Sequence, residues 1–210
     1  MRYKIISVTP FEQNCSLIYC EKTSAAAIID PGGDIPLIEA AINEAGVSPQ
    51  KILVTHAHLD HVGAVADLAE KYQIPILGPH RDDQFWIDAL PQQAEMFGFP
   101  PAKTFTPDHW LKQGEQIQVG ETTLNVLHCP GHTPGHIIYY SPTDKLAIVG
   151  DVLFAGSIGR TDFPQGNHEN LIHSIQERLF PLGDEVDFIP GHGPMSSFGQ
   201  ERQNNPFLKA

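Results

Sequence analysis

The chain has 210 residues, 41% of them hydrophobic, which is enough for one substantial core and too few for two ordinary domains. A formal net charge of −12 without any basic cluster excludes nucleic acid as a natural partner. The opening stretch MRYKIISVTP lacks the apolar core of a signal peptide, no run approaches the roughly 18 apolar residues of a membrane span, and three cysteines are too few for a disulfide framework. We therefore expect a single domain over residues 1–210 in the cytoplasm, without membrane attachment.

Apolar and β-branched runs bounded by turn residues predict strands throughout the chain. These runs cover residues 3–8, 16–20, 25–29, 51–55, 74–77, 116–119, 122–128, 136–140, 145–149 and 186–189. Strands and helices mix without strict alternation, so we expect mixed sheets covered by helices and not a simple doubly wound fold.

Helical spacing of apolar residues predicts three helices, each with one apolar face. These faces are Ile35, Ile38, Ala41 and Ile42; then Val62, Val65, Ala66, Ala69 and Tyr72; and finally Leu171, Ile172, Ile175 and Leu179. Residues 80–97 also have helical spacing, but we expect Pro91 to interrupt a helix there.

The stretch THAHLDH places His56, His58, Asp60 and His61 directly after the apolar run KILV. Side chains alternate along an extended chain, so His56 and His58 can chelate one ion from the same side. Asp60 and His61 fall where the chain turns into the next helix, and a turn there can direct them at a second ion. A purely structural explanation must find partners for four buried polar groups at once, so we interpret the cluster as metal-binding.

Three further candidate ligands follow later predicted strands: His132 in PGHTPGH, Asp151 in VGDVLF and His192 in IPGHGP. A lone histidine in a loop is as often a hydrogen-bonding residue as a metal ligand. These three positions are candidate ligands because each begins a polar loop after a predicted buried strand. A carboxylate has two oxygens and can bridge two ions. If Asp151 bridges, one site comprises His56, His58 and His132, and the other comprises Asp60, His61 and His192.

HAHLDH, the later GH, the aspartate of GD and the final PGHG together resemble the metal signature of the metallo-β-lactamase superfamily, over about residues 15–195. Asp30 in IIDPGG matches the first, mainly structural aspartate of that family. The segment GDVLFAGSIGRTDFPQG resembles the glyoxalase II and persulfide dioxygenase branch, above all the short bacterial type II glyoxalases. The resemblance implies an α/β fold, an αβ/βα four-layer sandwich of two mixed β-sheets flanked by helices, with the metals at one edge.

The resemblance also implies a function. It points to hydrolysis of a glutathione thioester, S-D-lactoylglutathione, to D-lactate and glutathione by a metal-bound hydroxide, as in methylglyoxal detoxification. Two divalent ions are expected, zinc in the first place with iron or manganese as alternatives, in a monomer or weak homo-oligomer. Asp60 is expected to orient the hydroxide, while Asp30 and His136 are candidates for fixing ligand orientation, with a plain structural role as the alternative.

One part of the glyoxalase II pattern is missing. Longer enzymes of that branch have a C-terminal helical domain whose basic residues hold the glutathione carboxylates, and we expect no such domain here. Arg160 stands where their loop carries a substrate-contacting lysine, so it is the remaining candidate anchor. An ion pair between Arg160 and Asp162 that shapes the loop GRTD is an equally good interpretation.

Two rival functions share much of this ligand set. A persulfide dioxygenase would use one iron held by His56, His132 and Asp151, a two-histidine, one-carboxylate triad suited to oxygen activation. A non-catalytic metal-binding protein ranks lower, because the ligands form an open arrangement and not a closed structural one. Class B β-lactamases of the commonest type carry a cysteine where Asp151 stands, which disfavours that activity.

Overall fold

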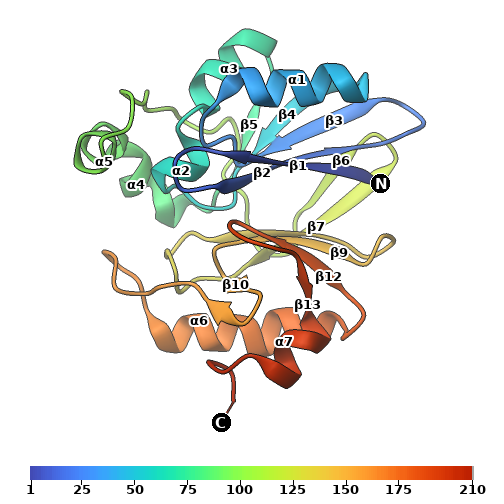
Figure 1. Cartoon of the computed structure of the whole chain (residues 1–210), viewed down its shortest axis with the longest axis vertical. Coiled ribbons are helices and arrows are strands. Elements are labelled where there is room, and N and C mark those ends of the chain that lie inside the picture. Colours follow the sequence, from blue (N-terminus) through green and yellow to red (C-terminus); the bar gives the residue numbers. More distant parts are fainter. Residues whose placement is uncertain (210) are drawn as a thin grey trace.

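Two large β-sheets pack face to face in the computed structural model, which describes residues 1–209 (Figure 1). Helices α1 and α3 cover the outer face of one sheet, and α6 and α7 cover the outer face of the other. The result is the four-layer αβ/βα sandwich that the sequence predicts. Within the same residues, no helix is long and apolar enough to cross a bilayer.

The first sheet has the order β1-β2-β3-β4-β5. Its strands are β1 (Arg2–Val8), β2 (Gln13–Tyr19), β3 (Ala25–Ile29), β4 (Ser48–Leu53) and β5 (Ile76–Leu77). The first three pair antiparallel, whereas β4 runs parallel to β3 and to β5. Parallel neighbours need a crossover, and the helices that supply it are α1 (Ile35–Ala45), α2 (Leu59–Val62) and α3 (Val65–Tyr72).

The second sheet has the order β13-β12-β9-β8-β7-β6. Its strands are β6 (Gln116–Val119), β7 (Thr122–His128), β8 (Ile137–Ser141), β9 (Leu146–Gly150), β12 (Asp187–Pro190) and β13 (Ser196–Ser197). β9 and β12 run parallel, joined through α6 (His168–Ser174) and a π-helical turn (Ile175–Leu179), and α7 (Phe198–Asn204) follows β13. β10 (Leu153–Phe154) and β11 (Ser157–Ile158) form a small hairpin after Asp151.

The core lies in three layers, one between the sheets and one under each pair of helices. Ile29 and Ile148 belong to the layer between the sheets, whereas Ile28 packs towards the helices α1 and α3. Strands β3, β8 and β9 are buried along their whole length because both of their faces are covered. This explains why these strands are continuous apolar runs in the sequence.

The ten predicted strands are present, with ends that shift by up to three residues. The helix expected after the histidine cluster is wrong as one element, because the chain breaks it into α2 and α3 around Gly63. A β-carbon at Gly63 would lie 2.5 Å from the carbonyl oxygen of Gly32, so the break brings the two backbones into contact. As expected, residues 80–97 do not form one helix: α4 (Gln84–Asp88) ends before Pro91, and α5 (Leu90–Phe97) begins with Pro91 in its first turn, where a proline costs no hydrogen bond.

Candidate metal centre

The predicted ligands lie on four segments that leave the carboxyl ends of strands, with Asp60 and His61 in the short helix α2 and the others on loops. His56 follows β4 in the first sheet, while His132, Asp151 and His192 follow β7, β9 and β12 in the second. The centre therefore lies at the edge where the two sheets meet, and both halves of the chain contribute to it.

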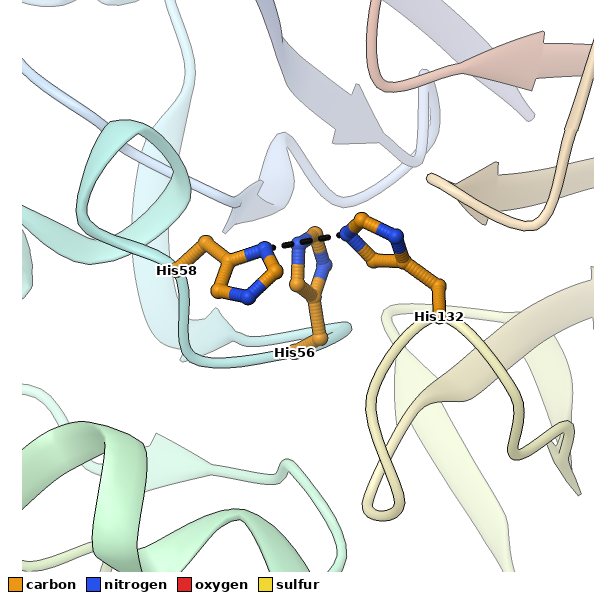
Figure 2. Close-up of side chains that lie close together, drawn as sticks. All are labelled: His56, His58 and His132. Atoms are coloured by element: carbon orange, nitrogen blue, oxygen red, sulfur yellow. Dashed lines mark hydrogen bonds between the residues drawn. The ribbon is translucent and has the colours of Figure 1, made fainter. Parts of the chain in front are cut away.

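His56, His58 and His132 form one triad of buried imidazoles. Their candidate ligand nitrogens all lie within 4.8 Å of one another, and Figure 2 shows the three rings converging from two separate loops. Nδ1 of His58 lies 2.9 Å from Nε2 of His132. In this ring orientation His58 offers Nδ1 to the triad, and His132 offers Nε2.

Asp60, His61 and His192 form a second triad. Oδ2 of Asp60 lies 3.1 Å from Nε2 of His192 and 3.8 Å from Nε2 of His61. His61 is fully buried, whereas the other two side chains are partly exposed and reach the adjoining cavity.

The carboxylate of Asp151 lies between the two triads. One oxygen is 3.3 Å from Nε2 of His61, and the other is 3.6 Å from Nε2 of His132 and 3.7 Å from Nε2 of His192. The structure thus brings all seven predicted ligands into one cluster, with Asp151 in the position from which a carboxylate can bridge.

The donor set fits divalent cations. Nε2 of His56, Nε2 of His61 and Oδ1 of Asp151 are buried and have no hydrogen-bond partner among the described residues. Leaving such atoms unsatisfied costs on the order of 1–3 kcal/mol each, which a bound cation would offset. Imidazole nitrogens and carboxylate oxygens suit zinc, iron and manganese alike.

The protonation states of the ligands follow from burial and from Asp151. Burial lowers the pKa of His56 and of His58 well below the ordinary histidine value, which keeps these imidazoles neutral as metal ligation requires. Burial also opposes a charge on His61, but Asp151 and Asp60 outweigh it and raise the His61 pKa well above its usual range. Burial disfavours the charged form of Asp151 too, yet His61 holds the pKa of that carboxyl far below its usual value.

Hydrogen bonds behind the ligands orient their rings. Nδ1 of His61 donates to Asp30 at 3.0 Å, and Asp30 in turn accepts from the backbone N–H and the hydroxyl of Thr55 at 2.7 and 2.6 Å. Nδ1 of His132 donates to the carbonyl of Arg160 at 2.7 Å, and Nδ1 of His192 donates to the carbonyl of Phe11 at 3.0 Å. Each bond leaves the opposite ring nitrogen directed at the cluster.

His136 lies against the same cluster. Its ring stacks on that of His56 with centroids 4.6 Å apart, and its Nε2 accepts the backbone N–H of Asp151 at 3.1 Å. Both residues selected as candidates for orienting ligands, Asp30 and His136, are therefore buried and in contact with a predicted ligand.

Asp83 is a buried carboxylate that the sequence does not single out. It accepts hydrogen bonds from the N–H of Ala57 at 3.1 Å, the hydroxyl of Thr133 at 2.8 Å and the N–H of Gly135 at 2.6 Å. Ala57 separates His56 from His58, and Thr133 follows His132, so Asp83 joins the two loops of the histidine triad. Burial raises the pKa of Asp83 to about 7.

A cavity of about 640 Å³ opens beside the cluster. Five of the seven predicted ligands line it, and Arg160 lies on its wall. The Arg160 guanidinium pairs with both carboxylate oxygens of Asp162 at 2.6 and 2.7 Å, as the loop-shaping interpretation predicts. The cluster is thus open to a small molecule on this side.

Residues 8–192 match the Metallo-beta-lactamase superfamily, and the chain belongs to that family. The hydroxyacylglutathione hydrolase GloC of Haemophilus influenzae is 46% identical over 100% of this chain and 99% of its own length. The crystal structure of BLEG-1 B3 metallo-beta-lactamase is 36% identical, with TM-score 0.92 and full coverage of both chains. The crystal structure of TTHA1623 in a di-iron-bound form is also 36% identical, with TM-score 0.89 over 98% of this chain and 100% of that chain.

These relatives and the His/Asp clusters together make the chain an enzyme, a metallo-hydrolase of the metallo-β-lactamase superfamily.

Proposed function

We propose that the chain hydrolyses thioesters and that its substrate is S-D-lactoylglutathione, which it converts to D-lactate and glutathione. The observation that carries the proposal is the position of Asp151 between two ligand triads at the floor of a cavity for a small molecule. Full-length similarity to a hydroxyacylglutathione hydrolase supports the choice of substrate. We also propose that this reaction serves methylglyoxal detoxification in the cytoplasm.

Two divalent cations would be held by the residues that already converge. His56, His58 and His132 would hold one, Asp60, His61 and His192 the other, and Asp151 would contact both. When bound, such a pair of cations supplies Lewis-acid polarisation of a carbonyl and lowers the pKa of water from 15.7 to about 7.

Asp60 is the residue proposed to orient the attacking water. Its carboxylate lines the cavity and lies 3.1 Å from Nε2 of His192, which fixes its direction. A carboxylate in this position accepts a hydrogen bond from the water and turns the oxygen lone pair towards the thioester carbonyl.

The reaction needs no dedicated general acid. The water oxygen forms a bond to the carbonyl carbon, the C–S bond breaks, and the sulfur leaves as a thiolate that takes up a proton in solvent. A thiol pKa of about 8.5 makes that thiolate a good leaving group. The products are a carboxylic acid and a free thiol, so every atom of the thioester and the water is accounted for.

The proposal is tested with purified enzyme by metal analysis and three assays. We expect about two metals per chain and loss of S-D-lactoylglutathione at a rate that does not depend on oxygen. One iron per chain with oxygen consumption on glutathione persulfide would overturn the proposal in favour of the dioxygenase. Hydrolysis of a β-lactam without thioester hydrolysis, or bound metal without any turnover, would also overturn it.

A further inference from the structure

The wall of the cavity is aromatic. Phe11 comes from the turn between β1 and β2, Trp86 from α4, Phe97 from the end of α5, and Phe154 and Phe163 from the segment after Asp151. Segments far apart in the sequence therefore line the same cavity with rings, beside a cluster made of polar ligands.

Phe11 and Phe97 are incompletely covered. Their exposed fractions are 46% and 43%, which is unusual for a phenylalanine, and their rings meet edge to face with centroids 5.9 Å apart. Apolar surface that is gathered next to a reactive centre marks a binding surface. A ligand that covers these two rings removes this apolar surface from water.

Few polar groups of the wall are available to a substrate. Outside the predicted ligands, the side chains with polar groups that line the cavity within residues 1–209 are those of Trp86, Gln93 and Arg160, and the indole N–H of Trp86 has no hydrogen-bond partner there. The Gln93 amide accepts from the N–H of Leu59 at 3.0 Å and donates to the carbonyl of Trp86 at 2.9 Å.

The guanidinium of Arg160 also has partners within the protein. It forms two hydrogen bonds with Asp162, and its guanidinium lies 4.2 Å above the ring of Phe163. Arg160 is the only lysine or arginine that lines the cavity within residues 1–209, so the contacts that the wall offers a substrate are mainly apolar.

We propose that the cavity, besides accepting the lactoyl group, binds more tightly those thioesters whose acyl group carries an aromatic or branched apolar substituent, and that Phe11 and Phe97 determine this preference. The inference rests on the proposed thioester hydrolysis. The acyl substituent is the part concerned, because it is the short end of the molecule and stays beside the carbonyl carbon that must reach the cluster. A thiol part as long as glutathione extends from the cavity to solvent.

A matched pair of substrates tests this specificity in the metal-loaded enzyme. S-(3-phenyllactoyl)glutathione and S-lactoylglutathione differ by a phenyl ring in place of one hydrogen. We expect the phenyl substrate to have a KM roughly tenfold lower, because its ring is buried against apolar side chains. Equal KM values for the two substrates would overturn the proposal.

Variants of Phe11 and Phe97 test whether these two rings cause the difference in KM between the substrates. Phe97→Ala and Phe11→Ala should each raise the ratio of the KM of the phenyl substrate to that of S-lactoylglutathione roughly fivefold. Phe207→Ala is the matched control, since Phe207 is 55% exposed and does not line the cavity. Circular dichroism and metal content establish that each variant is folded and loaded.

The outcomes separate the two proposals. A rise in KM that is equal for both substrates would show a general effect of the variants and overturn the specificity. Turnover of both thioesters without preference would overturn the specificity alone, whereas absence of turnover with every thioester would overturn the proposed function and the specificity with it.

Discussion

Asp30 holds Nδ1 of His61 at 3.0 Å, so that the opposite nitrogen of that ring lies 3.3 Å from Asp151. Asp30 adopts a left-handed backbone conformation, with φ of 51°, at the end of β3. This strained position is maintained by the two hydrogen bonds from Thr55. A carboxylate 31 positions earlier in the chain thus decides which nitrogen of His61 is offered to the cluster.

Asp30→Ala should therefore weaken metal binding at the second triad. Loss of an orienting carboxylate behind a histidine ligand typically costs roughly 10–100-fold in metal affinity. Competition with a chelator, followed by metal analysis, measures the change. Asp187→Ala, which removes an exposed carboxylate from β12, is the control; equal affinity in the two variants would contradict the role.

Asp151→Ala should remove both metals and the activity together. Because Asp151 lies within 3.7 Å of a histidine nitrogen from each triad, the change leaves the histidine triad with no carboxylate and the second triad with that of Asp60 alone. Metal content per chain and the rate on S-D-lactoylglutathione are measured on the same preparation. Retention of one full equivalent of metal would show that the two triads bind independently.

Asp83→Ala should destabilise the fold. The change leaves the N–H of Ala57, the N–H of Gly135 and the hydroxyl of Thr133 without their acceptor in a fully buried position. We expect a loss of about 3 kcal/mol in the free energy of unfolding, measured with urea. The neighbouring Asp82→Ala removes a carboxylate that is 56% exposed and should change the stability by less than about 0.5 kcal/mol.

Asp83 should also give the metal-free protein a pH-dependent stability. Burial raises its pKa from 3.8 to about 7, so between these values the folded chain keeps a proton that the unfolded chain has released. The free energy of unfolding contributed by Asp83 therefore falls as the pH rises from about 4 to 7, by at most about 1.4 kcal/mol per pH unit.

The Asp83→Asn variant isolates this contribution, because it keeps the size of the side chain and does not titrate. The difference in unfolding free energy, wild type minus variant, should decrease steadily over that pH range. A difference that stays constant would show that Asp83 titrates in the folded chain as it does in the unfolded one.

Arg160→Ala should chiefly raise the KM for glutathione thioesters if Arg160 is the glutathione anchor, with kcat little changed. Asp162→Ala supplies the comparison, because it frees the guanidinium from its present partner and should lower the KM. Unchanged KM values in both variants would assign the pair to shaping the loop.

The buried strands and most of the candidate metal ligands could be predicted from the sequence, because local patterns specify them. Buried strands such as β3 and β9 are apolar along their whole length, and the spacing of His56, His58 and His61 after β4 places three candidate ligands by chain geometry alone. His132 and His192 were predictable because each follows a strand end, where the sandwich gathers its loops.

The contacts between distant segments were not predictable. Asp83 stands beside Asp82 in a polar stretch that resembles an exposed helix start, and its burial depends on the loops of Ala57 and Gly135 packing over it. The same holds for Phe11 and Phe97, which face one cavity only after the sandwich has formed. The break at Gly63 likewise depends on the approach of Gly32, which no local pattern shows.

Because the metal centre lies where the two sheets meet, it links the two halves of the chain. His56, His58, Asp60 and His61 belong to the N-terminal half of the chain, whereas His132, Asp151 and His192 belong to the C-terminal half. Cations held by both sets of ligands would connect the two halves, so their binding free energy would add to the free energy of unfolding. Metal binding and folding of the sandwich would then be thermodynamically coupled. Removal of the metals by a chelator would lower the stability of the whole fold and not only of the metal centre.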